Sequence, residues 1–226
     1  MNRAAGVLQM HLRDKWMWFY IPSIILMSSF LVNLIIGSLT EEPIYTGGLF
    51  SILIYMLVAG ILTLTQTFPF ALGLSVRRKD FYIGTASMIV LASAATAILL
   101  LILSLIEKWT DAWSTELHFF NLPYLSDGSA PQNLFIFFIL LLHAYYLGFA
   151  ISSVHRRFGR LGMYVFSIGS FLIFTIAGYS ITFLGWWDNI WIWVADQNAF
   201  GLALWLIPPV AVYALTSYLL LRKATA

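Results

Sequence analysis

Charged residues are scarce in this sequence, and cysteine is absent. Only 10% of the 226 residues are charged, while 61% are hydrophobic. A soluble domain carries about 25% charged and about 45–50% apolar residues, so this chain has too few polar residues to cover a water-exposed surface. The absence of cysteine excludes disulfides, thiolate nucleophiles and thiolate metal ligands. A net charge of only +2 does not suggest a nucleic-acid-binding protein.

Six stretches contain no Asp, Glu, Lys or Arg and are long enough to cross a membrane, which takes about 20 mainly apolar residues. They are residues 16–40, 46–76, 81–106, 128–155, 161–187 and 197–221. We expect one helix in each, over residues 17–39, 47–72, 82–106, 132–155, 161–184 and 200–221. The sequence therefore predicts one all-α integral membrane domain, residues 1–226, with six transmembrane helices.

The basic residues indicate the orientation of the chain. If six helices alternate in direction, eleven of the twelve basic residues fall on one side of the membrane. That side carries a charge of +9 and the other side −7. Because Lys and Arg are enriched in cytoplasmic loops, we expect both termini to be cytoplasmic in a multi-pass protein of the cell membrane.

The hydrophobic runs lack the groups that chemistry within a bilayer usually requires. Histidine is the only ionisable acid or base in them, whereas ion-coupled carriers usually hold a carboxylate or base in the membrane. The sequence has no His-Glu-x-x-His zinc motif, no Gly-x-Ser-x-Gly elbow and no Gly-x-x-x-x-Gly-Lys-Ser/Thr phosphate loop. We therefore expect no enzymatic activity, no metal and no cofactor in this chain.

Three embedded residues are candidates for a pathway or a hinge. His143 lies near the middle of the fourth run. It is either a pathway or gating residue or a neutral imidazole that hydrogen-bonds a neighbouring helix. Pro208 and Pro209 remove two backbone donors from the sixth run and crowd the carbonyls of Leu204 and Trp205. They predict a kink, which could serve as a hinge.

Two segments have the composition of membrane interfaces. A stripe at helical spacing beside three cations predicts a short N-terminal interfacial helix. It consists of Ala5, Leu8, Leu12 and Trp16. Residues 184–200 are too polar to span and rich in tryptophan, which predicts either a re-entrant segment in the outer leaflet or an aromatic belt that caps two helices. The tryptophans concerned are Trp186, Trp187, Trp191 and Trp193.

The connection between the second and third runs, residues 68–84, is compact and basic. It reads Phe-Pro-Phe-Ala-Leu-Gly-Leu-Ser-Val-Arg-Arg-Lys-Asp-Phe-Tyr-Ile-Gly. The proline near the helix end, the Gly-x-Ser, the basic run, the acid followed by two aromatic residues and the final glycine resemble the permeases of type 2 ABC exporters. The residue-level resemblance covers these 17 residues, while the expected topology agrees with that family over nearly the whole chain.

The resemblance implies a six-helix subunit that works with a separate ATP-binding cassette ATPase, on which ATP and Mg²⁺ would be bound. A second permease subunit, identical or related, would complete the translocation pathway. The coupling segment that docks on the ATPase would contain Arg77, Arg78, Lys79, Asp80, Phe81 and Tyr82. A second cytoplasmic loop would contain His155, Arg156, Arg157 and Arg160.

Within the coupling segment, we expect Phe81 or Tyr82 to be the apolar anchor for the ATPase. The aromatic, charge-free spans favour a hydrophobic or amphipathic cargo, such as a drug, a lipid or an antimicrobial peptide. The alternative is a membrane scaffold, sensor or immunity protein that transports nothing. It accounts equally well for the missing embedded charges, but not for a compact basic loop shaped for a partner.

Overall fold

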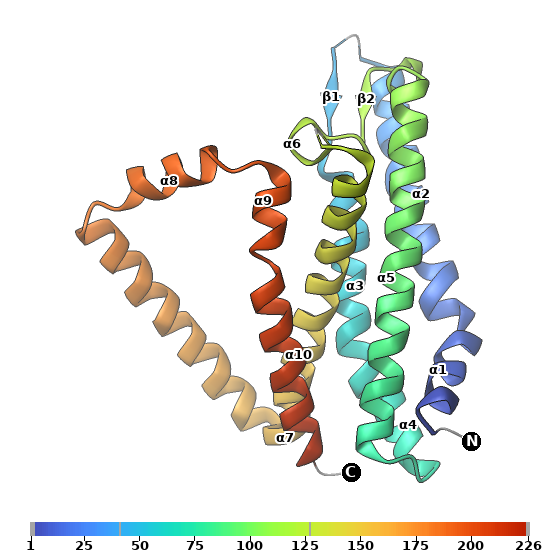
Figure 1. Cartoon of the computed structure of the whole chain (residues 1–226), viewed down its shortest axis with the longest axis vertical. Coiled ribbons are helices and arrows are strands. Elements are labelled where there is room, and N and C mark those ends of the chain that lie inside the picture. The colour runs from blue at the N-terminus through green and yellow to red at the C-terminus, as the bar shows by residue number, and fades with distance from the viewer. Residues whose placement is uncertain (1–2, 41, 127, 225–226) are drawn as a thin grey trace.

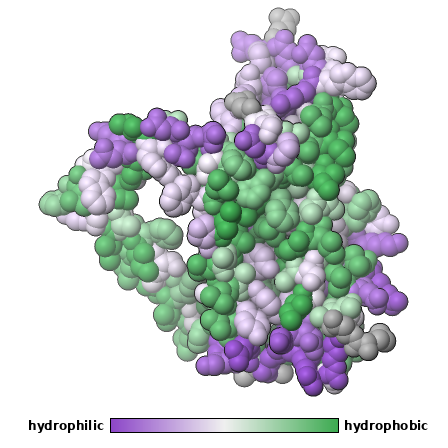
Figure 2. Space-filling view, in the orientation of Figure 1, coloured by the Kyte–Doolittle hydropathy of each residue, from purple (hydrophilic) through white to green (hydrophobic). Residues whose placement is uncertain are grey.

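The computed structural model describes residues 3–40, 42–126 and 128–224, and it is built of long helices (Figure 1). In this described part, five helical stretches are long and apolar enough to cross a membrane. They are Trp16–Ser38, Gly47–Gly73, Arg78–Trp109, Ala130–Phe183 and Ala199–Arg222. Figure 2 shows hydrophobic residues over the middle of the molecule and hydrophilic residues gathered towards its two ends. The protein is therefore an all-α protein with the character of a membrane protein.

The first three membrane helices occupy nearly the residues that the sequence predicts. The elements are α1 (Arg3–Arg13), α2 (Ile21–Ser38), α3 (Phe50–Leu62), α4 (Phe68–Gly73) and α5 (Arg78–Trp109). π-Helical turns at Trp16–Tyr20 and Thr63–Thr67 lead into α2 and α4. Such turns interrupt the regular hydrogen-bond ladder and are often found at functional sites.

One end of the bundle carries the only strands of the described residues. β1 (Ile44–Tyr45) pairs in parallel with β2 (Leu117–His118), so that Ile44 lies opposite Leu117 and Tyr45 opposite His118. The short helix α6 (Pro123–Ser126) lies at the same end (Figure 1). We call this end, with residues 42–46 and 110–126, the strand end.

Helix α7 (Ala130–Phe183) is broken at Gly159. Its 54 residues would extend about 80 Å as one straight helix, far more than the hydrocarbon core of about 30 Å. Gly159 has φ 67° and ψ −159°, a conformation that glycine adopts without steric cost. Segment 130–158 packs in the bundle and segment 160–183 diverges from it (Figure 1).

The second cytoplasmic loop expected at His155–Arg160 is therefore not a loop. These residues are helical on both sides of a single glycine, because one residue with positive φ is enough to redirect the chain. The remaining elements are α8 (Trp187–Ala195), α9 (Ala199–Leu204) and α10 (Ile207–Arg222). In Figure 1, α8 runs across from the far end of α7 to α9, and α10 returns along the bundle.

The centre of the bundle is a close contact between α3 and α7. A Cβ atom at Gly60 would overlap the carbonyl oxygen of Tyr145, and one at Gly148 would overlap that of Leu57. The two backbones therefore touch, which small residues permit in membrane helices. The fully buried Tyr145 donates a hydrogen bond to Oγ1 of Thr63 at 2.6 Å, in the π-helical turn before α4.

Helix α1 is present, but it docks through a different face from the one that the sequence predicts. Val7 and His11 are buried against α5, and a Cβ atom at Gly84 would lie 2.6 Å from Cβ of Val7. Leu12 and Trp16, at the end of the predicted stripe, are exposed. Lipid-facing and packed faces are equally apolar in a membrane protein, so periodicity alone does not tell them apart.

Candidate functional site: the basic end

Three segments far apart in the sequence meet at the end of the bundle opposite the strands. They are the α4–α5 connection, the break in α7 and the end of α10, and both described termini lie towards the same end (Figure 1). We call this region the basic end. It contains Arg77, Arg78, Lys79, Arg156, Arg157, Arg160, Arg222 and Lys223.

Backbone carbonyls at the end of α10 accept hydrogen bonds from the other two segments. Arg78 donates to the carbonyl oxygen of Arg222 at 3.4 Å, and Arg157 donates to that of Lys223. The Arg156 guanidinium lies over the ring of Phe68, with its Cζ atom 5.5 Å from the ring centroid. The two predicted cytoplasmic segments and the C-terminal helix therefore form one continuous region.

The α4–α5 connection is a tight turn of defined geometry. Ser75 has φ 58°, and its N–H donates to the carbonyl of Leu72 at 2.9 Å. The N–H of Val76 donates to the carbonyl of Ala71 at 3.1 Å. This pair of bonds around a left-handed residue is a Schellman motif, which ends α4 and reverses the chain.

The turn leaves two apolar side chains at the surface beside cations. Phe70 is 59% exposed and Leu74 is 61% exposed. Arg77 and Lys79, which follow directly, are also exposed. We call Phe70, Leu74, Arg77 and Lys79 the tip. Neither Phe70 nor Leu74 stands out in the sequence as a site residue, because both look like the end of a hydrophobic span.

The two residues predicted to anchor the ATPase, Phe81 and Tyr82, contact other parts of the chain. Phe81 is 0% exposed, with its ring centroid 5.0 Å from that of Phe68 and 6.2 Å from that of His11. Tyr82 is half-buried and donates a hydrogen bond to the carbonyl of Ala214 at 2.7 Å. Phe81 thus packs inside the chain, contrary to the expectation that it anchors a partner, and Tyr82 ties α5 to α10. Asp80 lies in the first turn of α5, where the helix dipole favours an acid.

His11 ties α1 to α5. Its Nε2 lies 3.0 Å from Oγ1 of Thr85, and its ring packs edge-on against Trp18. Burial lowers the pKa of His11 from 6.5 to about 4, against the opposing effect of the Asp14 charge. The imidazole is therefore neutral at pH 7, and its protonation would weaken the docking of α1.

The other predicted site residues lie away from the basic end. His143 packs against Tyr213 of α10, with ring centroids 5.5 Å apart. Within the described residues, its buried Nδ1 has no hydrogen-bond partner. Pro208 and Pro209 occupy the first turn of α10, after an interruption of the helix at residues 205–206. The helical stretch Ala199–Arg222 is therefore interrupted directly before the proline pair, next to the carbonyls where the sequence predicts a kink.

The tryptophans of the predicted interfacial segment lie on or beside α8 and are all exposed. Nε1 of Trp187 donates to Oγ1 of Thr182 at 3.0 Å. The rings of Trp193 and Trp205 meet edge to face, with centroids 5.7 Å apart. These contacts link α8 to the helix that precedes it and to the start of α10.

A buried carboxylate organises the strand end, and no sequence pattern pointed to it. Glu107 is 1% exposed and accepts hydrogen bonds from the N–H groups of residues 119, 120 and 121, at 2.8–3.2 Å. It also accepts one from Nε1 of Trp113 at 3.1 Å and lies 3.8 Å from Nδ1 of His118. Because most of these donors belong to the backbone, the amino-acid sequence does not reveal them.

Neither a protein-family model nor a curated protein nor a solved structure matches this chain. Among the described residues, no group of three histidine or acidic side chains could hold a metal ion. The basic end presents cations and exposed apolar side chains on a rigid turn. Such a surface is suited to binding a partner.

Proposed function

We propose that this chain is the transmembrane subunit of an ABC exporter, which couples to a separate ATP-binding subunit and forms half of a translocation pathway. The observation that carries the proposal is the tip. Interface energy is concentrated in a few aromatic and arginine residues, and the tip holds Phe70 and Arg77 on a turn with fixed hydrogen bonds. A partner with an apolar pocket and an acidic rim would complement it.

The orientation follows from the same charges. In this proposal the basic end is cytoplasmic, as the positive-inside rule favours, and the strand end is external. Segments 130–158 and 160–183 of α7 are each long enough to cross the membrane, so they would be the fourth and fifth of six spans. Helix α8 would then lie in the outer interface, with its exposed tryptophans at the level of the head groups.

A second permease subunit would cover part of segment 160–183. By helix periodicity, Phe171 and Phe174 lie on the side of this segment turned away from Val165 and Phe166, which line a hollow beside α10. Both phenylalanines are exposed in the single chain. Pairing two such segments across a central pathway would give a path lined by apolar side chains, which favours a hydrophobic or amphipathic cargo.

The contacts at the basic end would transmit a movement of the ATPase to helix α10. Closure of two ATPase subunits on ATP would displace the tip, and α10 would follow through the bonds of Arg78 and Tyr82. The interruption before Pro208 is the place where α10 could change its angle to α9. The chemistry stays on the partner, while this chain converts it into the rocking of a helix bundle.

The experiment is copurification of the tagged chain from its native membrane in mild detergent. We expect an ATP-binding subunit in a one-to-one ratio. Replacing Phe70 and Leu74 together with Ala should weaken its association by roughly 2 kcal/mol or more, the scale of an interface hot spot. Ile98→Ala/Ile102→Ala is the matched control, because both isoleucines are about half exposed on α5, outside the tip.

Failure of the wild-type chain to retain an ATPase would contradict the proposal and favour a scaffold, sensor or immunity protein. Retention by wild type and by the tip variant alike would keep the exporter subunit but remove the tip as its docking site. The double variant Arg77→Lys/Arg78→Lys distinguishes docking in a protein groove from attraction to lipid. Lys cannot reproduce the paired hydrogen bonds of Arg in a protein groove, whereas attraction to lipid head groups depends on charge alone.

A further inference from the structure

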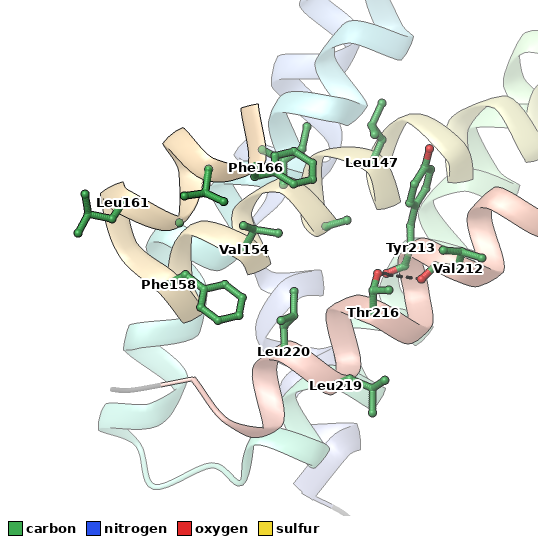
Figure 3. A pocket seen from close by; sticks show the side chains of 14 residues that line it. Leu147, Val154, Phe158, Leu161, Phe166, Val212, Tyr213, Thr216, Leu219 and Leu220 are labelled. Carbon is green, nitrogen blue, oxygen red and sulfur yellow. Dashed lines mark hydrogen bonds between the residues drawn. The ribbon is translucent and has the colours of Figure 1, made fainter. Parts of the chain in front are cut away.

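An apolar groove runs between the two segments of α7 and helix α10 (Figure 3). Its volume is about 920 Å³, within the range of about 300–1,000 Å³ that is typical of ligand sites. Side chains from all three walls, such as Val154, Phe166 and Leu220, converge on it in Figure 3. None of the 14 lining residues is charged. The hydroxyl of Thr216 bonds to carbonyls of its own helix, and apart from it and the hydroxyl of Tyr213 the lining side chains are apolar.

The groove continues into a second hollow at the basic end. This hollow, of about 570 Å³, shares Phe158, Leu219 and Leu220 with the groove. Its other lining residues are Arg157, Arg222 and Lys223. An apolar trough thus ends at three cations.

Two of these cations are held in place without being neutralised. Arg157 donates to the carbonyl oxygen of Lys223, and the Arg222 guanidinium lies over Tyr218, with Cζ 5.8 Å from the ring centroid. In the part of the chain that the structure describes, the one close contact between a carboxylate and a basic side chain joins Glu107 and His118 at the strand end. The three positive charges are therefore available to an anion from outside the chain.

We propose that the groove is a binding site for one anionic phospholipid of the inner leaflet. Its acyl chains lie between segment 160–183 and α10, and its phosphate lies at Arg157, Arg222 and Lys223. Basic pockets between membrane helices on the cytoplasmic side are suited to anionic head groups. The inference rests on the orientation in the proposed function, but not on the ATPase.

The three cations favour an anionic phospholipid over a second copy of the chain or a zwitterionic lipid. A second copy of the chain would bring a basic end of its own towards the three cations, which disfavours the contact. A zwitterionic lipid would fill the trough, but its ammonium group would offset the attraction of its phosphate. The bound lipid would also occupy the space between segment 160–183 and the bundle, so it would hold the segment at its observed angle.

Native mass spectrometry of the purified chain tests the proposal, with phosphatidylglycerol and phosphatidylcholine of identical acyl chains as probes. We expect wild type to retain phosphatidylglycerol about tenfold more strongly. Arg157→Gln/Arg222→Gln/Lys223→Gln should abolish this preference. Arg3→Gln/Arg13→Gln/Lys15→Gln removes the same charge from the N-terminal segment, outside the groove, and should preserve it.

A substitution in the trough separates the acyl-chain site from the charges. Val154→Trp fills the groove and should lower the retention of both lipids, whereas Val90→Trp on the exposed side of α5 should not. Thermal unfolding of each variant without added lipid shows whether it is folded. Equal retention of the two lipids by wild type, or an unchanged preference in the groove triple variant, would overturn the proposal. It would also be overturned if Val154→Trp dissociated a dimer without changing lipid retention, because the groove would then hold a second copy.

Discussion

The two halves of the molecule have similar compositions and different degrees of packing. Of the described residues, 3–158 (the packed half) contain nearly all the buried side chains, whereas none of residues 160–202 (the detached half), all of which the structure describes, is buried. Both halves are apolar, so hydrophobicity does not explain the difference. In lipid, helices associate through close packing and hydrogen bonds, since the lipid tails are as apolar as the side chains.

The packed half has the features that this kind of association requires. Gly60 and Gly148 bring two backbones into contact, and the hydroxyl of Tyr55 donates to the carbonyl of Met17. In the detached half, a methyl group added at Gly169 or Gly178 would have no neighbour within 4 Å. Segment 160–183 therefore carries small residues and exposed aromatic side chains that do not pack against another helix of the chain.

Phe81→Ala should have the largest effect. Removing this fully buried ring leaves a cavity among Phe68 and His11, and such truncations cost about 3–5 kcal/mol. Phe174→Ala in the detached half removes a ring that is 76% exposed and should change stability little. Thermal unfolding in one detergent compares the two. Equal losses would show that segment 160–183 is packed as tightly as the bundle.

Acidification should release α1 from the packed half. The pKa of His11 is 6.5 when undocked and about 4 when docked, so the undocked form binds the proton more readily. Docking is therefore at full strength above pH 6.5 and weakens as the pH falls towards 4, by about 3 kcal/mol in total. Hydrogen exchange of residues 3–13 across this range measures it. His11→Gln should remove the pH dependence; if the variant kept it, another group would be responsible.

Glu107→Gln tests how the strand end is held. The substitution keeps the shape but removes the charge that receives four N–H groups, and hydrogen bonds to a charged partner contribute about 1.5–3 kcal/mol. We expect faster proteolysis within residues 110–122 while the helices stay intact. Glu116→Gln, an exposed acid of the same loop, is the control. Matching protease resistance in the two variants would argue against the role assigned to Glu107.

Gly60→Ala and Gly169→Ala compare the two halves by a single methyl group. At Gly60 the methyl meets the carbonyl oxygen of Tyr145, and overpacking of this kind costs about 1–3 kcal/mol. At Gly169 it meets open space within the chain. We expect a lower unfolding temperature for the first variant only. Destabilisation of purified oligomer by Gly169→Ala would instead show that a second subunit packs at this point.

The sequence predicted the first three membrane helices well and the contacts between helices poorly. Charge-free runs locate membrane helices because charges are costly in lipid, and the first three helices agree with them closely. The basic residues around Gly159 predicted a loop, since cations mark the end of a span. The structure needs only the positive φ of Gly159 to redirect the chain there.

The residues that the sequence analysis missed share one cause. Glu107 binds mainly backbone groups, and Thr63 meets Tyr145 across 82 positions of the chain, so neither leaves a local pattern. Val7 and His11 lie beside an equally apolar stripe that faces outwards. Phe70 and Leu74 are exposed beside the turn at which Ser75 reverses the chain. In each case the role of the residue depends on its three-dimensional contacts and not on a local sequence pattern.

Labelling of single cysteines in intact cells tests the central claim, that the chain spans the membrane six times with its basic end in the cytoplasm. The natural chain has no cysteine, so each introduced thiol is the only one. Ser75, Ser114 and Asn189 are exposed positions in the tip turn, at the strand end and on α8. We expect an impermeant thiol reagent to label Ser114→Cys and Asn189→Cys but not Ser75→Cys. Labelling of Ser75→Cys, or protection of Asn189→Cys, would contradict it.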